Sequence, residues 1–460
     1  MLLLLFCAVL FSVEGCYWSA QCPYGLYSSK TPYETVRGDI RDYAVPQNCQ
    51  AVSIWTINRH GNRNPGNSVT TAMKAMVNLK NEIIASYDAG RGQMCAQDID
   101  ELRRWNWNDT MDVSQSFLTG TGYEELYDIA KRIRQKYPHL LEGSDQDYYF
   151  RPTNEQRTIT SAMAFVHGLT DGTNLTLQAD KERKKDEVIR PYENCDRYQE
   201  DVKNGQALED EIAAYHRTAE YVAVQNAVQQ RLGITTQLST EDVYSLYELC
   251  RFYRSWTENL RSPWCAAFTE QDLVVLEYRD DVRHYHRNGY GSWVNVNLGA
   301  APLRDLYKTF EAVVENQSSR KVVSYFTHDT MLEMVFCAMG IFKDATPLRG
   351  ATRDVNRLWR TSYIGAFSVN IIAVLNRCGA TGPQSYRVQI FINEKPTELC
   401  PLEGCSWQEF MNKFQPFLTS TLDFCSRDYR VPVADSAGDF KGYLHWLVIL
   451  QIILIQIWRL

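Results

Sequence analysis

Residues suited to phosphate chemistry gather in the segment 59–65, which reads Arg-His-Gly-Asn-Arg-Asn-Pro. Guanidinium groups such as those of Arg59 and Arg63 bind phosphate oxygens bidentately and stay charged at physiological pH. His60 lies between them, and repulsion by like charges would keep its imidazole neutral, with a lone pair free to attack. Gly61 removes a side chain where a ligand must come close. The segment therefore predicts a phosphate site in which His60 is the nucleophile.

Polar residues follow three extended apolar runs, each at the point where the run gives way to a turn or a helix. The runs are 51–57, 147–150 and 321–326, and they lead to His60, Arg157 and His328-Asp329 in that order. Because ligands in open α/β sheets bind at the carboxyl ends of strands, we expect these side chains to meet. Three arginines could neutralise phosphoryl oxygens and a carboxylic acid could protonate an alcohol, so no cofactor or metal is expected.

The alternation of apolar runs with helical periodicity predicts an α/β fold, with a mostly parallel sheet flanked by helices. Helices are expected at 73–85, 123–137, 158–169 and 331–339, with capping boxes at Thr121/Glu124 and Thr330/Glu333.

The alternation fades between 180 and 306, where long charged stretches at 201–232 and 240–260 indicate an inserted, smaller all-α domain. The catalytic α/β domain would then comprise 16–179 and 307–434. The charged cluster 181–186 is expected to be a solvated surface. His284 and His286 have no companion ligands at zinc spacing, so they are expected on a surface helix.

Both ends of the chain carry signals of the secretory pathway. Residues 1–15 form a short apolar run followed by small residues, which predicts a cleaved signal peptide. Thirteen cysteines less Cys7 leave twelve, an even number that could pair completely, with Cys250–Cys265 and Cys400–Cys405 as candidates. Glycosylation sequons start at Asn108, Asn174 and Asn316. The expected location is the extracellular face of the plasma membrane, or the secreted fraction.

A formal net charge of −7 argues against binding of nucleic acid, which needs an extended track of Lys and Arg. Any phosphate site must therefore be local. The oligomeric state is left open by the sequence.

The segment 59–65 resembles the active-site signature of the histidine acid phosphatases, a branch of the phosphoglycerate-mutase-like superfamily. Among these enzymes, the multiple inositol polyphosphate phosphatases, which are phytase-like, have further stretches similar to this chain. These stretches are 157–162, 190–195, 262–265, 276–278, 289–291 and 393–395, so the resemblance covers about 47–428.

The resemblance implies a role for each residue of the expected site. His60 would become phosphorylated, Arg59, Arg63, Arg157 and His328 would bind the transferred phosphoryl group, and Asp329 would protonate the leaving alcohol. Water would then hydrolyse the phosphohistidine. The implied substrate is an inositol polyphosphate.

The chain departs from that branch at two places. It reads His-Asp-Thr at 328–330, where the branch usually has His-Ala-Glu, and Asn64 stands where an aromatic residue commonly precedes the proline. Asp329 thus resembles the acid of other histidine phosphatases and fungal-type phytases. Two alternatives stay open: a general acid phosphatase acting on phosphoproteins or other phosphomonoesters, and a catalytically silent surface protein that binds phosphate.

The C-terminal segment predicts a lipid anchor. Small residues at 435–438 precede a mixed spacer and the apolar run 446–458, the pattern of a glycosylphosphatidylinositol (GPI) attachment signal with Ser436 as acceptor. Thirteen helical residues reach only ~20 Å, short of a bilayer core of ~30 Å. We expect a phospholipase that cleaves such anchors to release the protein from membranes. Retention in the membrane fraction after this treatment would contradict the anchor.

Overall fold

The computed structural model describes residues 24–173, 175–256, 261–379 and 382–429. The predicted signal peptide at 1–15, the sequon asparagine Asn174 and the predicted anchor site Ser436 lie outside these ranges. Within them, no helix combines the length and the apolar composition that a membrane span requires. Asn108 and Asn316 are exposed, as glycan attachment requires, and their modification stays a prediction.

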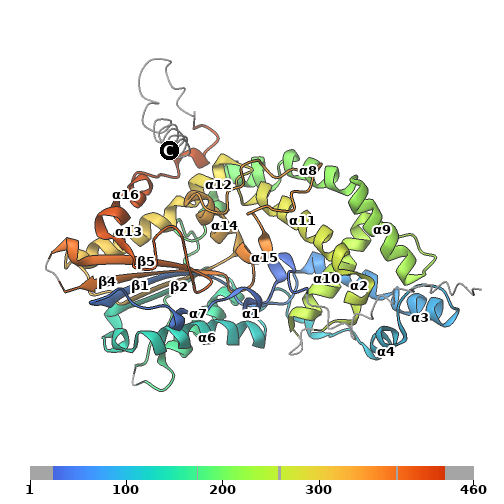
Figure 1. Cartoon of the computed structure of the whole chain (residues 1–460), viewed down its shortest axis with the longest axis horizontal. Helices are drawn as coiled ribbons and strands as arrows, with labels where there is room; N and C mark the ends of the chain where they lie inside the picture. The colour runs from blue at the N-terminus through green and yellow to red at the C-terminus, as the bar shows by residue number, and fades with distance from the viewer. Residues whose placement is uncertain (1–23, 174, 257–260, 380–381, 430–460) are drawn as a thin grey trace, which may run out of the picture.

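A mixed sheet of seven strands forms one half of the molecule (Figure 1). The strands lie in the order β2-β3-β1-β4-β5-β6, and β7 pairs with β5. Their bounds are β1 (Cys49–Arg59), β2 (Tyr148–Pro152), β3 (Val322–Thr327), β4 (Asn370–Cys378), β5 (Tyr386–Ile392), β6 (Lys395–Pro396) and β7 (Cys405–Ser406).

The α/β class predicted from the sequence is confirmed, with one change in the sheet. Strands β2, β3 and β1 are parallel, as predicted, but β4 is antiparallel to β1, and β5 is antiparallel to β4. Strands β4 and β5 are joined by the short connection 379–385, which is long enough for a hairpin but not for a parallel crossover. The sheet is therefore mixed rather than mostly parallel.

Side chains of β1 alternate between two apolar cores, one on each face of the sheet. Ile54 lies in the core formed with α6 and α7, whereas Trp55 and Ile57 lie in the core that includes α13, α14 and α16 (Figure 1). All three are fully buried, which stabilises the fold by roughly 1.5–3 kcal/mol for each aliphatic side chain. The covering helices are α6 (Gly120–Lys136), α7 (Gln156–Thr170), α13 (Ala300–Val314), α14 (Asp329–Ala338) and α16 (Trp407–Leu418).

A group of helices beside the sheet is built from two separate stretches of chain (Figure 1). The first stretch contains α2 (Asn67–Val77), α3 (Lys80–Asp88), α4 (Ala96–Arg104) and α5 (Thr110–Val113), and the second contains α8 (Gln206–His216), α9 (Ala219–Leu232), α10 (Thr240–Trp256) and α11 (Glu270–Arg287). Helix α2 packs on α10, and α3 on α9. These contacts join helices from both parts of the predicted division into 16–179 with 307–434 and an insert at 180–306. That division stays a prediction.

Short helices connect these layers. They are α1 (Tyr33–Val36), α12 (Trp293–Leu298) and α15 (Thr361–Ile364), with the 3₁₀ turns η1 (Ser28–Lys30) and η5 (Pro191–Asn194) and the π-helix η6 (Tyr198–Lys203). The predicted helix at 73–85 is divided between α2 and α3, and the predicted stretch 201–232 is divided among η6, α8 and α9.

Both predicted capping boxes are wrong. Helix α6 begins three residues earlier than expected, at Gly120, and its cap is Thr119 instead of Thr121; the Thr119 hydroxyl accepts a hydrogen bond from the Gly122 amide at 3.1 Å. Helix α14 begins directly at the end of β3, so that Thr330 is already inside the helix. Glu333 is fully buried and bonds to another helix instead of to a cap.

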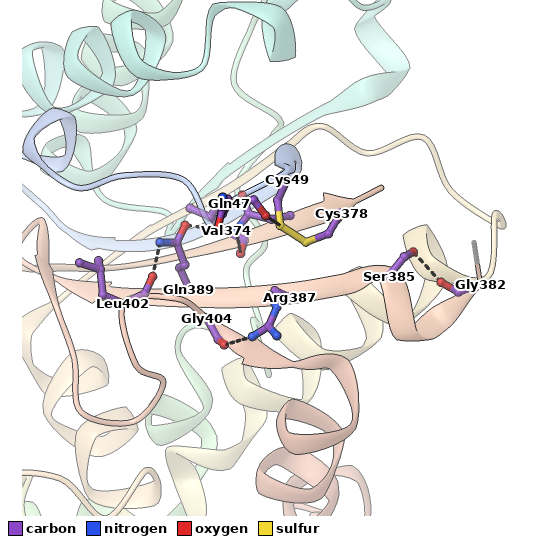
Figure 2. Close-up of a disulfide and its surroundings, with 11 residues drawn as sticks. Gln47, Cys49, Val374, Cys378, Gly382, Ser385, Arg387, Gln389, Leu402 and Gly404 are labelled. Atoms are coloured by element: carbon purple, nitrogen blue, oxygen red, sulfur yellow. Dashed lines mark hydrogen bonds between the residues drawn. A yellow bond between two sulfur atoms is a disulfide. The ribbon is translucent and has the colours of Figure 1, made fainter. Parts of the chain in front are cut away.

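Four disulfides join pairs of cysteines that both lie within the described residues. Both candidate pairs, Cys250–Cys265 and Cys400–Cys405, are confirmed. Two long-range pairs were not predicted, namely Cys195–Cys425 and Cys49–Cys378; the second joins register partners on β1 and β4 (Figure 2). Within the described residues Cys337 is free and buried, so the expectation that all twelve cysteines pair is wrong.

A buried ion pair fixes the segment that precedes β1. Glu394 lies with positive φ in the turn after β5, and its carboxylate accepts two hydrogen bonds of 2.7 Å from Arg132 of α6. It also accepts a hydrogen bond from the Tyr33 hydroxyl at 2.8 Å. Because removal of one partner would leave a buried charge uncompensated, this contact holds α1 and α6 against the sheet.

Candidate active site

The carboxyl ends of β1, β3 and β2 lie side by side at one edge of the sheet. Arg59 at the end of β1 pairs with Thr327 at the end of β3, and Phe326 pairs with Pro152 at the end of β2. These are the three strands that the sequence predicted to deliver polar residues. The chain continues from them into His60, into the turn before α7 and into the first turn of α14, and it thereby brings the expected site residues together.

His60 is held by backbone contacts in one orientation. Its amide donates to the Thr327 carbonyl at 2.9 Å, and its carbonyl accepts from Ser368 at 3.2 Å. The ring nitrogen Nδ1 lies 2.8 Å from the Gly61 carbonyl, an acceptor only, so Nδ1 carries the proton. The lone pair of Nε2 is therefore available, and the side chain lines a cavity.

The imidazole of His60 is neutral in this environment. Burial is the main cause, and the positive charges of Arg59, Arg157 and Arg63 add to it, so the pKa of His60 lies well below its usual value. The sequence predicted the repulsion by the arginines but gave no measure of burial. A nitrogen that stays unprotonated in acid can serve as a nucleophile there.

Gly61 is required for a reason other than the predicted one. A Cβ at Gly61 would lie 2.1 Å from the carbonyl oxygen of Gly122 in α6, and a Cβ at Gly122 would lie equally close to that of Asn62. The glycine therefore permits close approach of two backbones and not of a ligand. Glu125 of α6 adds to this contact by accepting from the Asn62 amide at 2.8 Å.

Arg59 is fully buried, and backbone carbonyls satisfy only one end of its guanidinium group. Its Nη1 donates to the carbonyls of Ser29 and Gly365, at 2.7 and 2.5 Å, and its guanidinium lies 4.7 Å from the centre of the Phe367 ring. Nη2 lies 3.2 Å from the Asp329 carboxylate. Among the described residues, Nε of Arg59 has no hydrogen-bond partner.

Arg63 and Arg157 complete a cluster of guanidinium groups. Nη1 of Arg63 donates to the Asn64 carbonyl at 2.7 Å, and Arg157 forms an ion pair with Glu155. Burial and the other two arginines lower the pKa of Arg63 to about 9. In the part of the chain that the structure describes, Nε of each is buried without an acceptor. Buried unpaired donors are costly, so the cluster is suited to receive an anion.

His328 is the N-cap residue of α14 and lies 5.6 Å from His60 between ring centres. Its Nδ1 accepts from Arg157 at 3.3 Å and its Nε2 lies 3.1 Å from the Thr153 hydroxyl. Burial, followed by the charges of Arg157 and Arg190, places the pKa of His328 well below its usual value. Both ring nitrogens are thus engaged, and in this arrangement His328 orients Arg157.

Asp329 is the first residue of α14 and faces the cavity beside Arg59. One carboxylate oxygen accepts from the Thr330 amide at 2.9 Å, and the other pairs with Arg59. Burial raises the pKa of Asp329, but the positive charges of Arg59, His284, Lys30 and Arg63 outweigh it, and the net pKa lies well below the usual value. The carboxylate is therefore ionised in this arrangement.

The cavity has a volume of about 160 Å³ and a second group of cations on its walls. These are Arg190, Lys203 of η6 and Arg287 at the end of α11, and they accompany Tyr192 and Tyr198. They were not among the site residues predicted from the sequence, although Arg190 opens one of the stretches that carry the family resemblance. Nε of Arg190 and of Arg287 is buried without an acceptor among the described residues.

Other sequence features lie away from the cavity. In the cluster 181–186, residues 181–185 are exposed as expected, but Asp186 is buried and pairs with Arg151 at 3.0 Å. The expectation of a surface helix for His284 is wrong, because its Nδ1 lies 2.9 Å from the buried carboxylate of Glu333. Within the described ranges, no three His, Cys, Asp or Glu side chains gather as metal ligands would.

Comparisons with known proteins agree with this geometry. Residues 52–393 match the histidine phosphatase superfamily (branch 2). Multiple inositol polyphosphate phosphatase 1 of Drosophila melanogaster is 31% identical, over 91% of this chain and 90% of that protein. A thiamine-repressible acid phosphatase of Schizosaccharomyces pombe is 24% identical, over 82% and 81% of the two chains.

A solved structure has the same fold. The crystal structure of the phytase from D. castellii superposes with a TM-score of 0.68 at 18% identity, covering 85% of this chain and 86% of that one. The match of the superfamily covers most of the chain and includes both the strand ends and the helices that frame the cavity. The chain therefore belongs to the histidine phosphatase superfamily (branch 2), and it is a phosphomonoesterase of that family.

Proposed function

We propose that this enzyme hydrolyses inositol polyphosphates through a covalent phosphohistidine formed on His60. The observation that carries the proposal is the neutral imidazole, whose Nε2 lone pair lies among three guanidinium groups whose Nε donors are buried and have no acceptor among the described residues. The similarity to an inositol polyphosphate phosphatase of Drosophila melanogaster supports the substrate class. The expected place of action is the cell exterior, where a lipid anchor at Ser436 would hold the enzyme.

The first step transfers the phosphoryl group to His60. Nε2 attacks phosphorus, the bond from phosphorus to the ester oxygen breaks, and the proton of Asp329 passes to the departing alcohol. Arg59, Arg63 and Arg157 neutralise the non-bridging oxygens, which is the largest contribution that a protein can make to phosphoryl transfer. In the second step water attacks phosphorus, the P–N bond breaks, and Asp329 accepts the proton of the water.

The proton on Asp329 requires an explanation, because its carboxylate pairs with Arg59 and is ionised in that contact. A bound phosphate dianion would compete for Arg59 and place negative charge next to the carboxylate. Both effects raise the pKa of Asp329. Substrate binding would thus protonate Asp329.

Specificity for several phosphates would come from the second group of cations. Lys203, Arg287 and Arg190 lie on the walls of the cavity that holds His60, at positions where a neighbouring phosphate of the ring could reach them. Arg190 is already paired with Glu155 at 2.6 Å, so Lys203 and Arg287 are the freer of the three. A substrate with one phosphate would use none of these contacts.

A general acid phosphatase is the second candidate function. It is favoured by Asp329, which stands where the inositol polyphosphate branch usually has alanine, and by the similarity to an acid phosphatase of Schizosaccharomyces pombe. Turnover of phytate, lower inositol phosphates and phosphotyrosine separates the two candidates. An enzyme that leaves phytate intact and hydrolyses phosphotyrosine would be a general phosphatase. Phosphate binding without any turnover would instead indicate a silent binding protein.

Replacement of the nucleophile should remove the covalent intermediate. We expect His60→Ala to abolish the acid-labile phosphoenzyme that is trapped when the wild-type protein is mixed with ³²P-labelled substrate and quenched. His167→Ala is the matched control, since this histidine lies in the last turn of α7 and bonds to Tyr123. A labelled phosphoenzyme in the His60→Ala protein would refute the assignment.

Replacement of the acid should affect poor leaving groups more than good ones. Asp329→Asn should slow the hydrolysis of an alkyl phosphate by about 10²–10⁴-fold, the usual contribution of a positioned acid. Turnover of 4-nitrophenyl phosphate should change much less, because its leaving group needs no proton. Equal losses on both substrates in steady-state assays would count against the role of Asp329.

Loss of the second group of cations should affect only substrates with several phosphates. Lys203→Met and Arg287→Met should each lower kcat/KM for inositol hexakisphosphate about 10–100-fold, as expected for a lost hydrogen bond between charged groups. The same variants should hydrolyse an inositol monophosphate at a rate within about twofold of the wild-type rate, because this substrate has no second phosphate for the replaced side chain to contact. Lys181→Met, in the exposed cluster, is the control. An equal loss of kcat/KM on both substrates would show that these side chains do not bind additional phosphates.

A further inference from the structure

Lys203 lies at the end of a π-helix that forms part of the cavity wall. This helix, η6, spans Tyr198–Lys203, and both of its end residues line the cavity. In an α-helix, two residues five apart point in directions about 140° apart. In a π-helix the hydrogen bonds join residues five apart, so the two end residues of η6 lie near one face. This uncommon helix therefore lets Lys203 face the same cavity as Tyr198.

Gln199 holds the ammonium group of Lys203 in that wall. Its Oε1 accepts a hydrogen bond from Nζ of Lys203 at 2.9 Å, and its Nε2 donates to the Tyr192 carbonyl at 2.8 Å. The carbonyl can only accept, so it fixes the orientation of the amide. An ammonium has three N–H donors, and the bond to Gln199 leaves two that a phosphate could accept. One amide thus joins Lys203 to η5, whose Tyr192 also lines the cavity.

The start of η6 is held by the end of the described chain, residues 423–429, which we call the C-terminal segment. Its Cys425 forms a disulfide with Cys195, three residues before η6 begins. The side chain of Arg197 donates to two backbone carbonyls of the C-terminal segment, those of Ser426 at 3.3 Å and Tyr429 at 2.5 Å. A covalent bond and two hydrogen bonds to backbone therefore fix the residues that lead into η6.

The C-terminal segment is itself held against the helices that frame the site. The buried Phe424 packs against Trp293 of α12, with 5.6 Å between ring centres. Helix α12 packs on α14, the helix that begins with Asp329, and it also contacts η6. The C-terminal segment therefore joins η6 to the same frame that holds the catalytic residues.

The acidic residues of η6 have a partner in the C-terminal segment. Glu200 and Asp201 both pair with Arg427, the second at 2.7 Å. All three side chains are about half exposed, so these pairs hold η6 less strongly than the disulfide does. They also neutralise two negative charges on the helix that carries Lys203.

The acidic side chains that line the cavity are paired with arginines as well. The pairs are Glu155 with Arg190 at 2.6 Å, Glu193 with Arg190 at 3.3 Å, and Asp329 with Arg59 at 3.2 Å. The hydrogen-bond partner of Lys203 is instead a neutral amide. Its positive charge is therefore left for an anion that enters the cavity.

We propose that Gln199 and the C-terminal segment are positioning elements that favour substrates with several phosphates, because they hold Lys203 where a phosphate beside the reacting one would lie. The inference rests on the proposed function, in which Lys203 binds that second phosphate. Neither Gln199 nor the C-terminal segment is among the elements that line the cavity. Gln199 acts by its bond to the lysine, and the C-terminal segment acts by fixing the helix that carries both residues.

The experiment compares Gln199→Met, a variant with both Cys195→Ser and Cys425→Ser, and Lys203→Met as reference. Methionine keeps the length of glutamine and removes both amide hydrogen bonds. The full chain is produced in cells with a secretory pathway, where disulfides form. We measure kcat and KM separately, with inositol hexakisphosphate and with an inositol monophosphate.

Each change has a matched control elsewhere in the chain. Gln206→Met replaces an exposed glutamine at the start of α8, whose Nε2 donates to Asp210 at 2.9 Å. Cys49→Ser with Cys378→Ser removes another long-range disulfide, at the amino end of β1 and so at the end away from His60.

We expect Gln199→Met to raise KM for inositol hexakisphosphate about 3–10-fold, the usual effect of a lost hydrogen bond. The value of kcat should change little, since Lys203 would bind the substrate and the transition state alike. Constants for the monophosphate should stay within about twofold of wild type, which also shows that the variants are folded. The cysteine variant should show the same pattern, and both controls should match wild type on both substrates.

A double variant shows whether the amide acts through the lysine. Gln199→Met combined with Lys203→Met should lose no more than Lys203→Met alone, because the bond that the amide makes to Lys203 is already absent. A further loss of kcat/KM for inositol hexakisphosphate in the double variant would contradict the inference.

Two other results would overturn it: an unchanged KM for inositol hexakisphosphate in Gln199→Met, or equal losses on the two substrates. Equal losses in the cysteine variant would show that the C-terminal segment supports the whole fold, and would overturn its part in the proposal. Failure of the proposed function gives a different result. If Lys203→Met keeps the wild-type constants for inositol hexakisphosphate, Lys203 binds no second phosphate, whatever the other variants do. If Lys203→Met behaves as proposed and Gln199→Met matches wild type, only the present inference fails.

Discussion

Concentration of buried positive charge around one neutral imidazole is the constraint on which the site depends. Arg59 has no exposed surface, yet only one of its terminal nitrogens is satisfied by backbone carbonyls. Burial lowers the pKa of Arg59, and the carboxylates of Asp329, Glu333 and Glu125 oppose that effect. Each unsatisfied buried donor costs about 1–3 kcal/mol, so the surrounding fold must stabilise an arrangement that only an anion completes.

The elements that supply this stabilisation come from distant parts of the chain. Ser29 and Gly365, whose carbonyls hold Arg59, belong to the segment before β1 and to the end of α15. Glu125 of α6 accepts from the Asn62 amide and from the Ser368 hydroxyl, each at 2.8 Å, and so ties both sides of the nucleophile loop to one helix. The loop that carries His60 is therefore held by contacts from distant parts of the chain.

Local sequence was sufficient for some of these features and insufficient for others. The strands that deliver His60 and His328-Asp329 could be predicted, because an apolar run followed by a polar turn is a local signal. The antiparallel direction of strands β4 and β5 was not predicted, since pairing direction depends on which distant strand is the neighbour. The predicted capping box at Thr330 and Glu333 was wrong for a similar reason, because Glu333 contacts His284 of α11 and not a backbone amide at the start of its own helix.

The second group of cations could not be predicted from local sequence either. Arg190, Lys203 and Arg287 are separated by many residues of unremarkable charged sequence, and only the fold places them in one cavity. Gly61 was recognised as important but for the wrong reason, because its partner Gly122 lies far along the chain. Residue types predict chemistry well where it is local, and poorly where it depends on long-range contact.

Arg59 pairs with Asp329 in the structure and would also be needed by a substrate phosphate in the proposed mechanism, and it cannot pair fully with both. In the structure it pairs with Asp329 at 3.2 Å and keeps that carboxylate ionised, which is not the state that a proton donor needs. In the proposed mechanism, an arriving phosphate dianion would take over the guanidinium, since it carries more charge than one carboxylate, and the pKa of Asp329 would then rise. The same exchange that binds the substrate would thus protonate the acid. A site built this way would hold its proton only when there is a leaving group to receive it.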